Sequence, residues 1–382
     1  MNRRQFGKTV AIGAAGLLIG FVAFRAEAGQ PFMEEKLPGT SIGQTESRWI
    51  APYALATRYR VGQTHVSTVR WFDDKGRVMK ELTGNLEARN DFIAEYRPEG
   101  AAWHAVYHDV NGRWKVDPPR KPGPSGYICA EGDTFVHQFH PVEGEIAADI
   151  YRSGKLIGTV GPFVQYKGRD VHLAGDGSLA FMAWKSPKME SLQVVVVGPD
   201  AKVSFTADCG PDVDNPRPID RGKGVIVEIV GAGEHHMRFR YMRAGGEWIP
   251  VEGAIDADTT VSTPDGSGLF FRTSFGKDSR FRLMDTANGK LIWEIPCPVR
   301  NPEGYTVSVT VFDDVFLFVG EEFAAVDIKT SEVLGRWTPN VPRTDPGRIA
   351  RLGDRIFLVT PDEFTEFDFT PADIAAKKYG WR

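Results

Sequence analysis

Cysteine is scarce in this chain of 382 residues. Its three cysteines, Cys129, Cys209 and Cys297, form no CxxC pair and no CxxCH haem-attachment motif. An odd number leaves at least one thiol outside any bridge, so at most one disulfide forms within the chain. The sequence leaves open whether two of the three are bridged, but it excludes a fold held by a disulfide framework.

An excess of basic residues is also absent. The chain has 46 Lys and Arg against 50 Asp and Glu, a formal net charge of -4. Proteins that bind nucleic acid need clustered basic side chains to displace counterions from the phosphates. We therefore expect no nucleic-acid partner, and contact with a membrane only through the N-terminal segment if that segment is retained.

Common catalytic motifs are missing too. There is no glycine-rich phosphate loop, no G-x-S-x-G nucleophile elbow and no H-E-x-x-H zinc motif. Of the eight histidines, the candidates for metal ligands are His137, His140 and His235. His137 and His140 converge only if the two residues between them leave extended geometry, and His235 is adjacent to His236, which an extended strand would point the opposite way. We expect no metal and no cofactor, and the catalytic residues of any enzyme stay unknown.

Residues 208–216 gather carboxylates in a loop-like, proline-containing stretch. The pattern departs from an EF-hand because Pro216 occupies the next alternate ligand position and the distal glutamate is missing. We expect a solvated loop here.

The N-terminus carries an export address. Arg3, Arg4, Phe6 and Lys8 resemble the twin-arginine motif of bacterial signal peptides, which family members usually complete with Ser or Thr before the arginines and Leu after the Phe. This chain departs from the family at those two places. The resemblance implies export of the folded protein by the twin-arginine machinery into the periplasm.

An apolar stretch and a cleavage pattern follow the arginines. Residues 9–24 are apolar and rich in Gly and Ala, and Ala26 and Ala28 form an A-x-A pattern. The apolar run is shorter than the ~20 residues that a spanning helix needs. We expect residues 1–28 to be a cleaved signal peptide. If cleavage fails, the segment anchors the protein to the membrane.

Two series of tight turns alternate along the rest of the chain. The first recurs at residues 71–78, 108–114, 151–156, 198–203, 243–248, 285–291 and 327–333, and the second at 90–91, 132–133, 176–177, 222–224, 265–266, 313–314 and 353–354. The spacing within the first series is roughly 36 to 46 residues, which suits a four-stranded propeller blade. Each repeat then reads as four strands joined by two tight turns and a loop.

Residues 281–293 are the clearest copy of the repeat. They read as a strand ending in Asp285, a turn through Gly289 and Lys290, and a strand bearing Trp293. This resembles the repeat of quinoprotein (PQQ)-like propellers, within the wider class that includes WD-repeat propellers, and departs from it at Asn288, where Thr is usual. Members of the quinoprotein family that bind the cofactor are longer and carry adjacent cysteines, which this chain lacks. The resemblance implies the architecture and not the cofactor.

The expected fold is all-β: a single β-propeller of four-stranded blades over residues 48–382. The third strands are predicted at 66–72, 105–109, 147–151, 193–197, 238–242, 281–284, 323–328 and 364–369, which favours eight blades over seven. The last blade lacks an obvious fourth strand. Within the N-terminal extension, residues 29–47, a strand around residues 39–49 is the candidate to complete that blade and close the ring.

Four tryptophans test the repeat. Trp114, Trp248, Trp293 and Trp337 stand at even offsets from their turns. Because alternate residues of a strand share a face, we expect these indoles on equivalent faces of their blades, where they pack between blades. The other interpretation is a row of binding platforms.

The sequence favours a non-catalytic binding or assembly subunit in the periplasm, with another exported protein as its partner. Loops at residues 117–126 and 208–222, rich in Pro and Gly, are the expected contact. The alternative is an enzyme with a site at the central channel, either a quinoprotein-like oxidoreductase or a metal-dependent hydrolase.

Overall fold

The computed structural model describes residues 46–366 except for a set of internal segments. These segments are 62–63, 90, 100–101, 120–127, 167–170, 230–237, 252–260, 264–265, 274–278, 300–306, 313, 321, 338–347, 353–354 and 361–363. The export residues Arg3, Arg4, Phe6, Lys8, Ala26 and Ala28 lie outside the described residues. The chain divides into two compact units, one built from β1–β8 and β29–β31 and the other from β9–β28.

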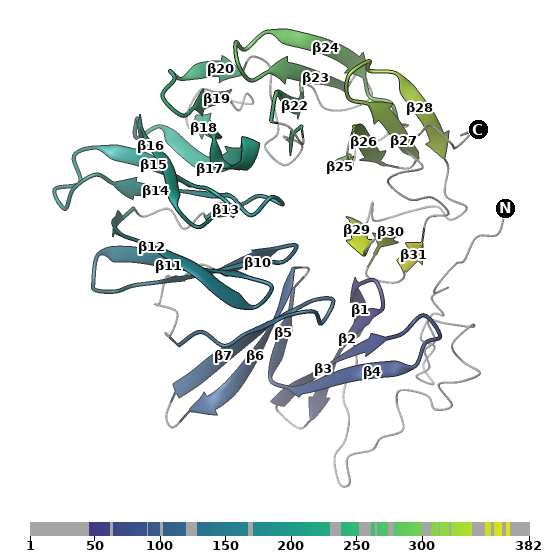
Figure 1. Ribbon diagram of the computed structural model, residues 1–382. Helices are drawn as coiled ribbons and strands as arrows, with labels where there is room; N and C mark the ends of the chain where they lie inside the picture. The colour runs from purple at the N-terminus through teal and green to yellow at the C-terminus, as the bar shows by residue number, and fades with distance from the viewer. Residues whose placement is uncertain are drawn as a thin grey trace. The chain divides into compact units, whose positions relative to one another are not determined.

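The first unit holds two antiparallel four-stranded sheets and one of three strands (Figure 1). In each sheet, neighbouring strands follow one another in the sequence. The strands are β1 (Glu46–Ala51), β2 (Ala54–Val61), β3 (Thr64–Phe72) and β4 (Val78–Gly84); β5 (Leu86–Ala88), β6 (Phe92–Glu99), β7 (Ala102–Asp109) and β8 (Lys115–Val116); and β29 (Arg348–Leu352), β30 (Arg355–Val359) and β31 (Phe364–Glu366).

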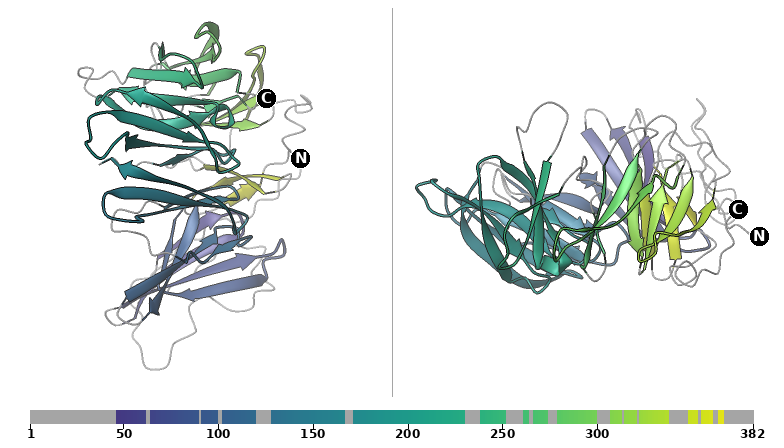
Figure 2. Two further views of the ribbon diagram at one scale, coloured as in Figure 1. Left: turned by 60° about the vertical axis from the view of Figure 1, so that its left-hand side comes forward. Right: turned by 90° about the horizontal axis from the view of Figure 1, so that it is seen from above.

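The second unit repeats the same meander five times. Figure 2 shows its sheets following one another from β9 to β28. The strands are β9 (Ile128–Glu131), β10 (Thr134–Phe139), β11 (Glu145–Arg152) and β12 (Lys155–Gln165); β13 (His172–Leu173), β14 (Leu179–Trp184), β15 (Leu192–Val197) and β16 (Val203–Cys209); β17 (Val213–Ile219), β18 (Gly224–Ile229), β19 (Arg238–Arg243) and β20 (Ile249–Val251); β21 (Val261–Ser262), β22 (Gly268–Arg272), β23 (Arg280–Asp285) and β24 (Leu291–Pro296); and β25 (Ser308–Phe312), β26 (Val315–Val319), β27 (Phe323–Asp327) and β28 (Val333–Trp337).

The first two meanders of this unit are joined into one sheet. Val164 and Gln165 at the end of β12 pair with Trp184 and Ala183 of β14. Apart from these two residue pairs, β9–β12 and β13–β16 form separate groups of four strands. The one helical turn among the described residues is η1 (Asp220–Gly222), between β17 and β18, and no helix of the described part has the length and apolarity to cross a membrane.

The fold class expected from the sequence is confirmed: the chain is all-β and is built from four-stranded antiparallel sheets of the propeller type. All eight predicted third strands coincide with the third strand of a group, namely β3, β7, β11, β15, β19, β23, β27 and β31. The described residues therefore form eight strand groups, as predicted, rather than seven.

Both turn series lie at the same end of each meander. In an antiparallel meander, the turn between the first and second strands and the turn between the third and fourth strands lie at the same end of the strands. Backbone hydrogen bonds join the two turns within a sheet. The Ser153 N–H donates to the Asp133 carbonyl at 2.7 Å, and the Thr286 N–H donates to the Ser267 carbonyl at 2.9 Å. The two turn series therefore lie together at one end of each sheet.

The aspartates of the turns explain why the turns recur. The Asp285 carboxylate accepts the N–H of Ala287 at 2.6 Å, and the Asp327 carboxylate accepts the N–H groups of Lys329 and Thr330 at 2.9 and 2.8 Å. An aspartate at the start of a turn satisfies backbone donors that no strand partner reaches. The second strands behave differently: β10, β22 and β26 are buried along their whole length. In β26 this burial on both faces accounts for a continuous apolar run.

Apolar cores lie between neighbouring sheets of a unit. In the second unit, Phe239 and Leu269 belong to the core between β17–β20 and β21–β24, and Phe270 and Phe316 belong to the next one. In the first unit, the sheet β1–β4 shares one core with β5–β8 and another with β29–β31. The first and last sheets of the described chain therefore pack directly on each other.

The strand predicted to complete the last sheet is described only from residue 46 onward. Residues 46–51 form β1, which pairs with β2 rather than with β29–β31. The described part of the last sheet has three strands, and Trp49 of β1 joins it through side-chain packing against Phe364 instead. The rest of the predicted strand, residues 39–45, lies outside the described residues.

Candidate functional site

The predicted metal candidates are not gathered into a site in the described structure. His137 is fully buried in β10 and stacks on Phe139, with ring centroids 6.4 Å apart. His140 follows the end of β10, where its Nδ1 bonds to the Glu145 carbonyl at 2.8 Å. His235 lies outside the described residues. Across the described part of the chain, no group of three or more His, Cys, Asp and Glu side chains is placed to hold a metal ion.

A polar cluster built from His108, Glu95 and Arg97 lies in the sheet β5–β8. His108 is 4% exposed, and its Nε2 lies 2.9 Å from Glu95 Oε2. Arg97 donates to the same carboxylate at 2.7 and 2.9 Å. Because a carboxylate only accepts hydrogen bonds, the histidine Nε2 is the donor and its Nδ1 is left as a buried acceptor without a hydrogen bond.

This environment sets the protonation of both groups. Burial lowers the pKa of His108, and the positive charges of Lys80 and Lys115 lower it further, against the opposing effect of Glu95. Burial alone would raise the pKa of Glu95, but its hydrogen bonds from Arg97 and His108 outweigh burial and lower it. The cluster therefore holds a neutral imidazole beside an ionised carboxylate, tied to an arginine.

The cysteines show no sign of reactive chemistry. Cys209 and Cys297 are free thiols, and burial raises the pKa of both, to about 12 for Cys209. A thiol is nucleophilic as the thiolate, so these two are unreactive at neutral pH. The side chain of Cys129 lies outside the described part.

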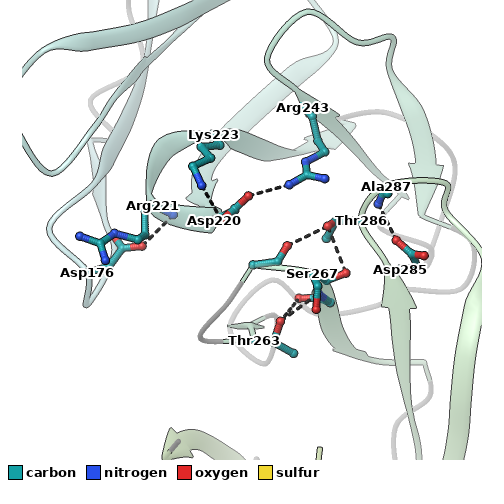
Figure 3. A network of polar contacts seen from close by, with 12 residues as sticks. Asp176, Asp220, Arg221, Lys223, Arg243, Thr263, Ser267, Asp285, Thr286 and Ala287 are labelled. Atoms are coloured by element: carbon teal, nitrogen blue, oxygen red, sulfur yellow. Dashed lines mark hydrogen bonds and ion pairs between the residues drawn. The ribbon is translucent and has the colours of Figure 1, made fainter. Parts of the chain in front are cut away.

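Polar contacts gather at the turns of three successive sheets (Figure 3). The Asp220 carboxylate, 5% exposed, accepts a hydrogen bond from Arg243 Nη2 at 2.7 Å and lies 3.9 Å from Lys223 Nζ. In the sheet before it, Asp176 Oδ2 accepts the N–H of Arg221 at 3.0 Å. A buried charge is tolerated when it is paired and hydrogen-bonded, so these contacts form a joint between sheets.

Close approach to the next sheet completes the joint. Gly266 lies at φ +70, and a Cβ built there would meet the Asp220 Cγ at 2.1 Å. The Gly266 carbonyl accepts the Thr286 hydroxyl at 2.7 Å (Figure 3). The turn of one sheet therefore lies directly on the buried aspartate of its neighbour, and only glycine fits.

The predicted loop at residues 208–222 is wrong. Residues up to Cys209 belong to β16, residues 213–219 form β17, and a short turn joins the two strands. η1, with the polar joint, follows directly. The stretch is therefore neither a calcium loop nor a free contact loop. Of the other expected contact loop, residues 120–126 lie outside the described residues.

The tryptophans pack, but not all on equivalent faces. The Trp293 Nε1 donates to the Ile328 carbonyl in the following sheet at 2.8 Å. The Trp248 Nε1 donates to the Asp208 carbonyl in the preceding sheet at 2.8 Å. Trp114 is buried, and the side chain of Trp337 lies outside the described part. The packing interpretation therefore agrees with the structure, whereas the prediction of equivalent faces is wrong for Trp248 and Trp293.

Exposed apolar side chains gather at one kind of position. Eight of the ten large hydrophobic residues that are exposed in the described structure stand in the first three positions of a fourth strand, close after its turn. We call these eight the strand-start residues. They are Val78 and Met79 of β4, Leu156 and Ile157 of β12, Val203 of β16, Leu291 and Ile292 of β24, and Val333 of β28.

A basic residue directly precedes the first strand-start residue in four of these five strands, namely Arg77, Lys155, Lys202 and Lys290. The fourth strands lie at the ends of the strand order or, for β12, have a first half that pairs on one side alone. Four of the five strands therefore combine an open backbone edge, apolar side chains and a positive charge. The turn motif contains a sequence signal for these residues, since Gly-Lys is followed by apolar residues. The alternation of side chains along a strand, however, predicts that only one of two consecutive apolar residues faces solvent.

Comparisons with known proteins bear on the fold. No family model matches the chain, and no curated protein matches it either. Among solved structures, it is similar to BamB from Moraxella catarrhalis, with 10% identity over 86% of this chain and 98% of that one and a TM-score of 0.42. It is also similar to the Dos1 propeller, with 11% identity over 73% of this chain and 82% of that one and a TM-score of 0.39. A third similar structure is the computationally designed Ika8 protein, with 9% identity over 82% of this chain and 92% of that one and a TM-score of 0.40.

The topology thus defines an all-β protein of the propeller class. The structural similarities are at 9–11% identity, and what the chain does is argued below from its own residues.

Proposed function

We propose that this protein is an exported, non-catalytic binding or assembly subunit, and that strand-start residues within each compact unit contact a protein partner. The observation that carries the proposal is their repeated exposure: Met79 is 67% exposed, Leu291 55% and Leu156 53%. Single exposed apolar residues are ordinary on protein surfaces, but the adjacent exposed pairs Leu156 with Ile157 and Leu291 with Ile292 leave apolar area that a partner can cover.

The rigidity of the surrounding sheets supports the proposal. The strand-start residues follow turns whose backbone is fixed by aspartates and by hydrogen bonds to neighbouring turns. Their neighbours in the same strands, such as Trp293 and Val160, are held in the cores between sheets. A surface of this kind loses little conformational entropy on binding, because its backbone is already ordered.

Periplasmic location and the partner's identity as another exported protein belong to the same proposal. They rest on the resemblance of the first 28 residues to a twin-arginine signal. That route carries folded proteins, commonly with a cofactor or a partner subunit.

The test is a gentle isolation of the natively exported protein. We expect a second exported protein to co-purify in stoichiometric amount. Combined replacement of Met79, Leu156 and Leu291 by Ser should abolish co-purification. The matched control is Met189→Ser with Val142→Ser, since these residues are 55% and 57% exposed but lie in connections between strands.

Two results would overturn the proposal. One is a clean monomer with no partner in any pull-down. The other is stoichiometric quinone absorbance or a tightly held transition metal in the isolated protein, which would support the oxidoreductase or the hydrolase instead.

A further inference from the structure

The fourth strand β24 has an open edge that carries apolar and charged side chains together. It pairs with β23 along one side and is last in the strand order β21–β22–β23–β24. No described strand pairs with its other side. A strand edge of this kind presents unpaired backbone N–H and C=O groups, to which another chain can add.

The side chains of β24 divide between the interior and the solvent. Trp293 and Ile295 pack into the core shared with β25–β28. Leu291 and Ile292, by contrast, are 55% and 48% exposed although they are consecutive in the chain. A register shift between β23 and β24 follows Leu283, so that Met284 pairs with Leu291 and Ile292 is the extra residue. The bulge therefore brings two neighbouring apolar side chains to the surface at the start of the open edge.

The charge around this edge is opposite in sign to that of the whole chain. Glu294 is shared by two arginines, with its oxygens 2.7 Å from Arg280 Nη1 and 2.5 Å from Arg282 Nε. The exposed Lys290 precedes the strand. The Asp285 carboxylate is directed to the N–H groups of its own turn. The edge therefore carries a positive excess, in a protein whose formal net charge is -4.

The other fourth strands combine these features less completely. In β4, Arg77 is paired with Asp73 and Glu81 with Arg70. In β12, the end of the strand pairs with β14, so its edge is open along only part of its length. In β16, Lys202 lies 3.8 Å from Asp200, and Val203 is the one exposed apolar residue at its start.

We propose that β24 is the docking edge for the partner, which adds an extended segment as a further strand of this sheet. The segment alternates acidic residues with apolar ones. Its carboxylates meet Lys290 and the cluster of Arg280 and Arg282 around Glu294, which keeps one positive charge in excess. Its apolar residues cover Leu291 and Ile292. Strand addition supplies affinity through main-chain hydrogen bonds and specificity through alternate side chains. The inference rests on the proposed function and names the site and the kind of partner.

The experiment uses a photo-crosslinking amino acid, p-benzoylphenylalanine, placed in the full-length protein in its exporting cells. It is introduced separately at Ile292 and at Pro296, both in β24, and at Met189 as an exposed control. The crosslinked residue of the partner is then identified by mass spectrometry. An added strand keeps a fixed register, so moving the probe from Ile292 to Pro296 should move the crosslinked partner residue by about four positions along one extended segment.

Two variants of opposite charge at one position then test whether that segment is acidic. A peptide with the crosslinked sequence is titrated against the variants Ile292→Lys and Ile292→Asp, after a check that both melt near the wild type. We expect Ile292→Asp to bind at least about tenfold more weakly than Ile292→Lys. Equal affinities, or the reverse order, would contradict an acidic segment.

The remaining outcomes separate the two proposals. Crosslinks that do not move with the probe, that reach a second copy of this chain or that reach lipid alone would overturn strand addition at β24. If a partner co-purifies but Ile292 gives no crosslink to it, the docking edge is wrong and the proposed function stands. If neither co-purification nor crosslinking occurs, both fail.

Discussion

Tyr53 and Phe364 lie in edge-to-face contact, with ring centroids 4.9 Å apart, although one belongs to the first sheet of the described chain and the other to the last. Both rings are buried, and Phe357 lies 5.7 Å from Tyr53 in the same cluster. Arg355 hydrogen-bonds the Tyr53 hydroxyl and forms an ion pair with Glu366. The two ends of the described chain are therefore held together by an aromatic core and an arginine, without a shared strand.

Replacing Phe364 with Ala should destabilise the protein by about 3–5 kcal/mol, because it empties a fully buried aromatic position between two sheets. Chemical denaturation gives the free energy of unfolding. The control is Leu291→Ala, at a site 55% exposed, which should change that free energy by no more than ~0.5 kcal/mol. Similar values for the two variants would show that the contact between the first and last sheets contributes little to stability.

The close contact at Asp220 predicts that replacing Gly266 with Ala costs more unfolding free energy than replacing Gly132 with Ala. Gly266 and Gly132 both have positive φ, +70 and +59, but a Cβ at Gly266 meets Asp220 whereas one at Gly132 meets nothing within 4 Å. Gly132→Ala should cost about 1–2 kcal/mol from backbone strain alone. Gly266→Ala should cost a further ~1–3 kcal/mol from overpacking.

A double-mutant cycle tests the cause of that difference. Truncating the aspartate as well, in Asp220→Ala with Gly266→Ala, should recover part of the second cost, because the Cγ and Oδ1 atoms nearest the new Cβ are removed and only the Asp220 Cβ, at 2.4 Å, remains. Additive effects of the two substitutions would place the strain elsewhere.

Trp293 should act through packing rather than as a ligand platform. Trp293→Ala removes the indole from the core shared with β25–β28 and should cost about 3–5 kcal/mol. Trp293→Phe keeps most of the ring but leaves the Ile328 carbonyl without its donor, so it should cost about 0.5–1.5 kcal/mol. Loss of partner binding with an unchanged Tm in both variants would instead support the platform.

The strands and turns were predictable because their signals are local. Aspartate and glycine mark turns that need particular backbone angles, and runs such as residues 315–319 mark strands buried on both faces. The segment around β17 was misread because its prolines suggest a loop. β17 is an edge strand, with Asn215 at φ +47 in a bulge, and an edge strand accommodates proline because one side needs no donor.

The joint and the tryptophan faces lay beyond sequence reasoning for a different reason. The contact of Gly266 with Asp220 depends on how two sheets pack, and nothing in either turn indicates its neighbour. The faces of Trp248 and Trp293 depend on the length of each turn and on the bulge that follows Leu283. One extra residue in a strand moves every later side chain to the other face.

Export should require both arginines of the signal-like segment. Changing Arg3 and Arg4 together to Lys keeps the charge but removes the pair that the twin-arginine motif requires, so a full-length precursor should accumulate in the cytoplasm. Cell fractionation with an antibody to the protein measures this. As a control, Lys188→Arg, an exposed substitution far along the chain, should be exported normally. Normal periplasmic accumulation of the double variant would show that the segment is not a twin-arginine signal.

His108 predicts how stability depends on pH. Burial lowers its pKa in the folded protein below the ordinary value near 6.5, so the unfolded chain binds a proton in a pH range where the folded protein does not. Stability is therefore fully present above about pH 6.5 and is lost as pH falls toward the lower folded pKa. The structural reason is that a second ring proton would place an N–H at the buried Nδ1, which has no hydrogen-bond partner in the described structure.

His108→Gln should flatten this dependence, because Gln does not titrate. We expect the wild type to lose more unfolding free energy than the variant between about pH 7.5 and about pH 5, a range that lies above the pH at which Glu95 contributes, since the pKa of that carboxyl is lowered from 4.5. Urea denaturation at each pH gives both curves, with Met189→Ser as a control that should run parallel to the wild type. Parallel curves for wild type and His108→Gln would mean that His108 has the same pKa in the folded and unfolded states, and the buried imidazole would then have to be charged beside Glu95.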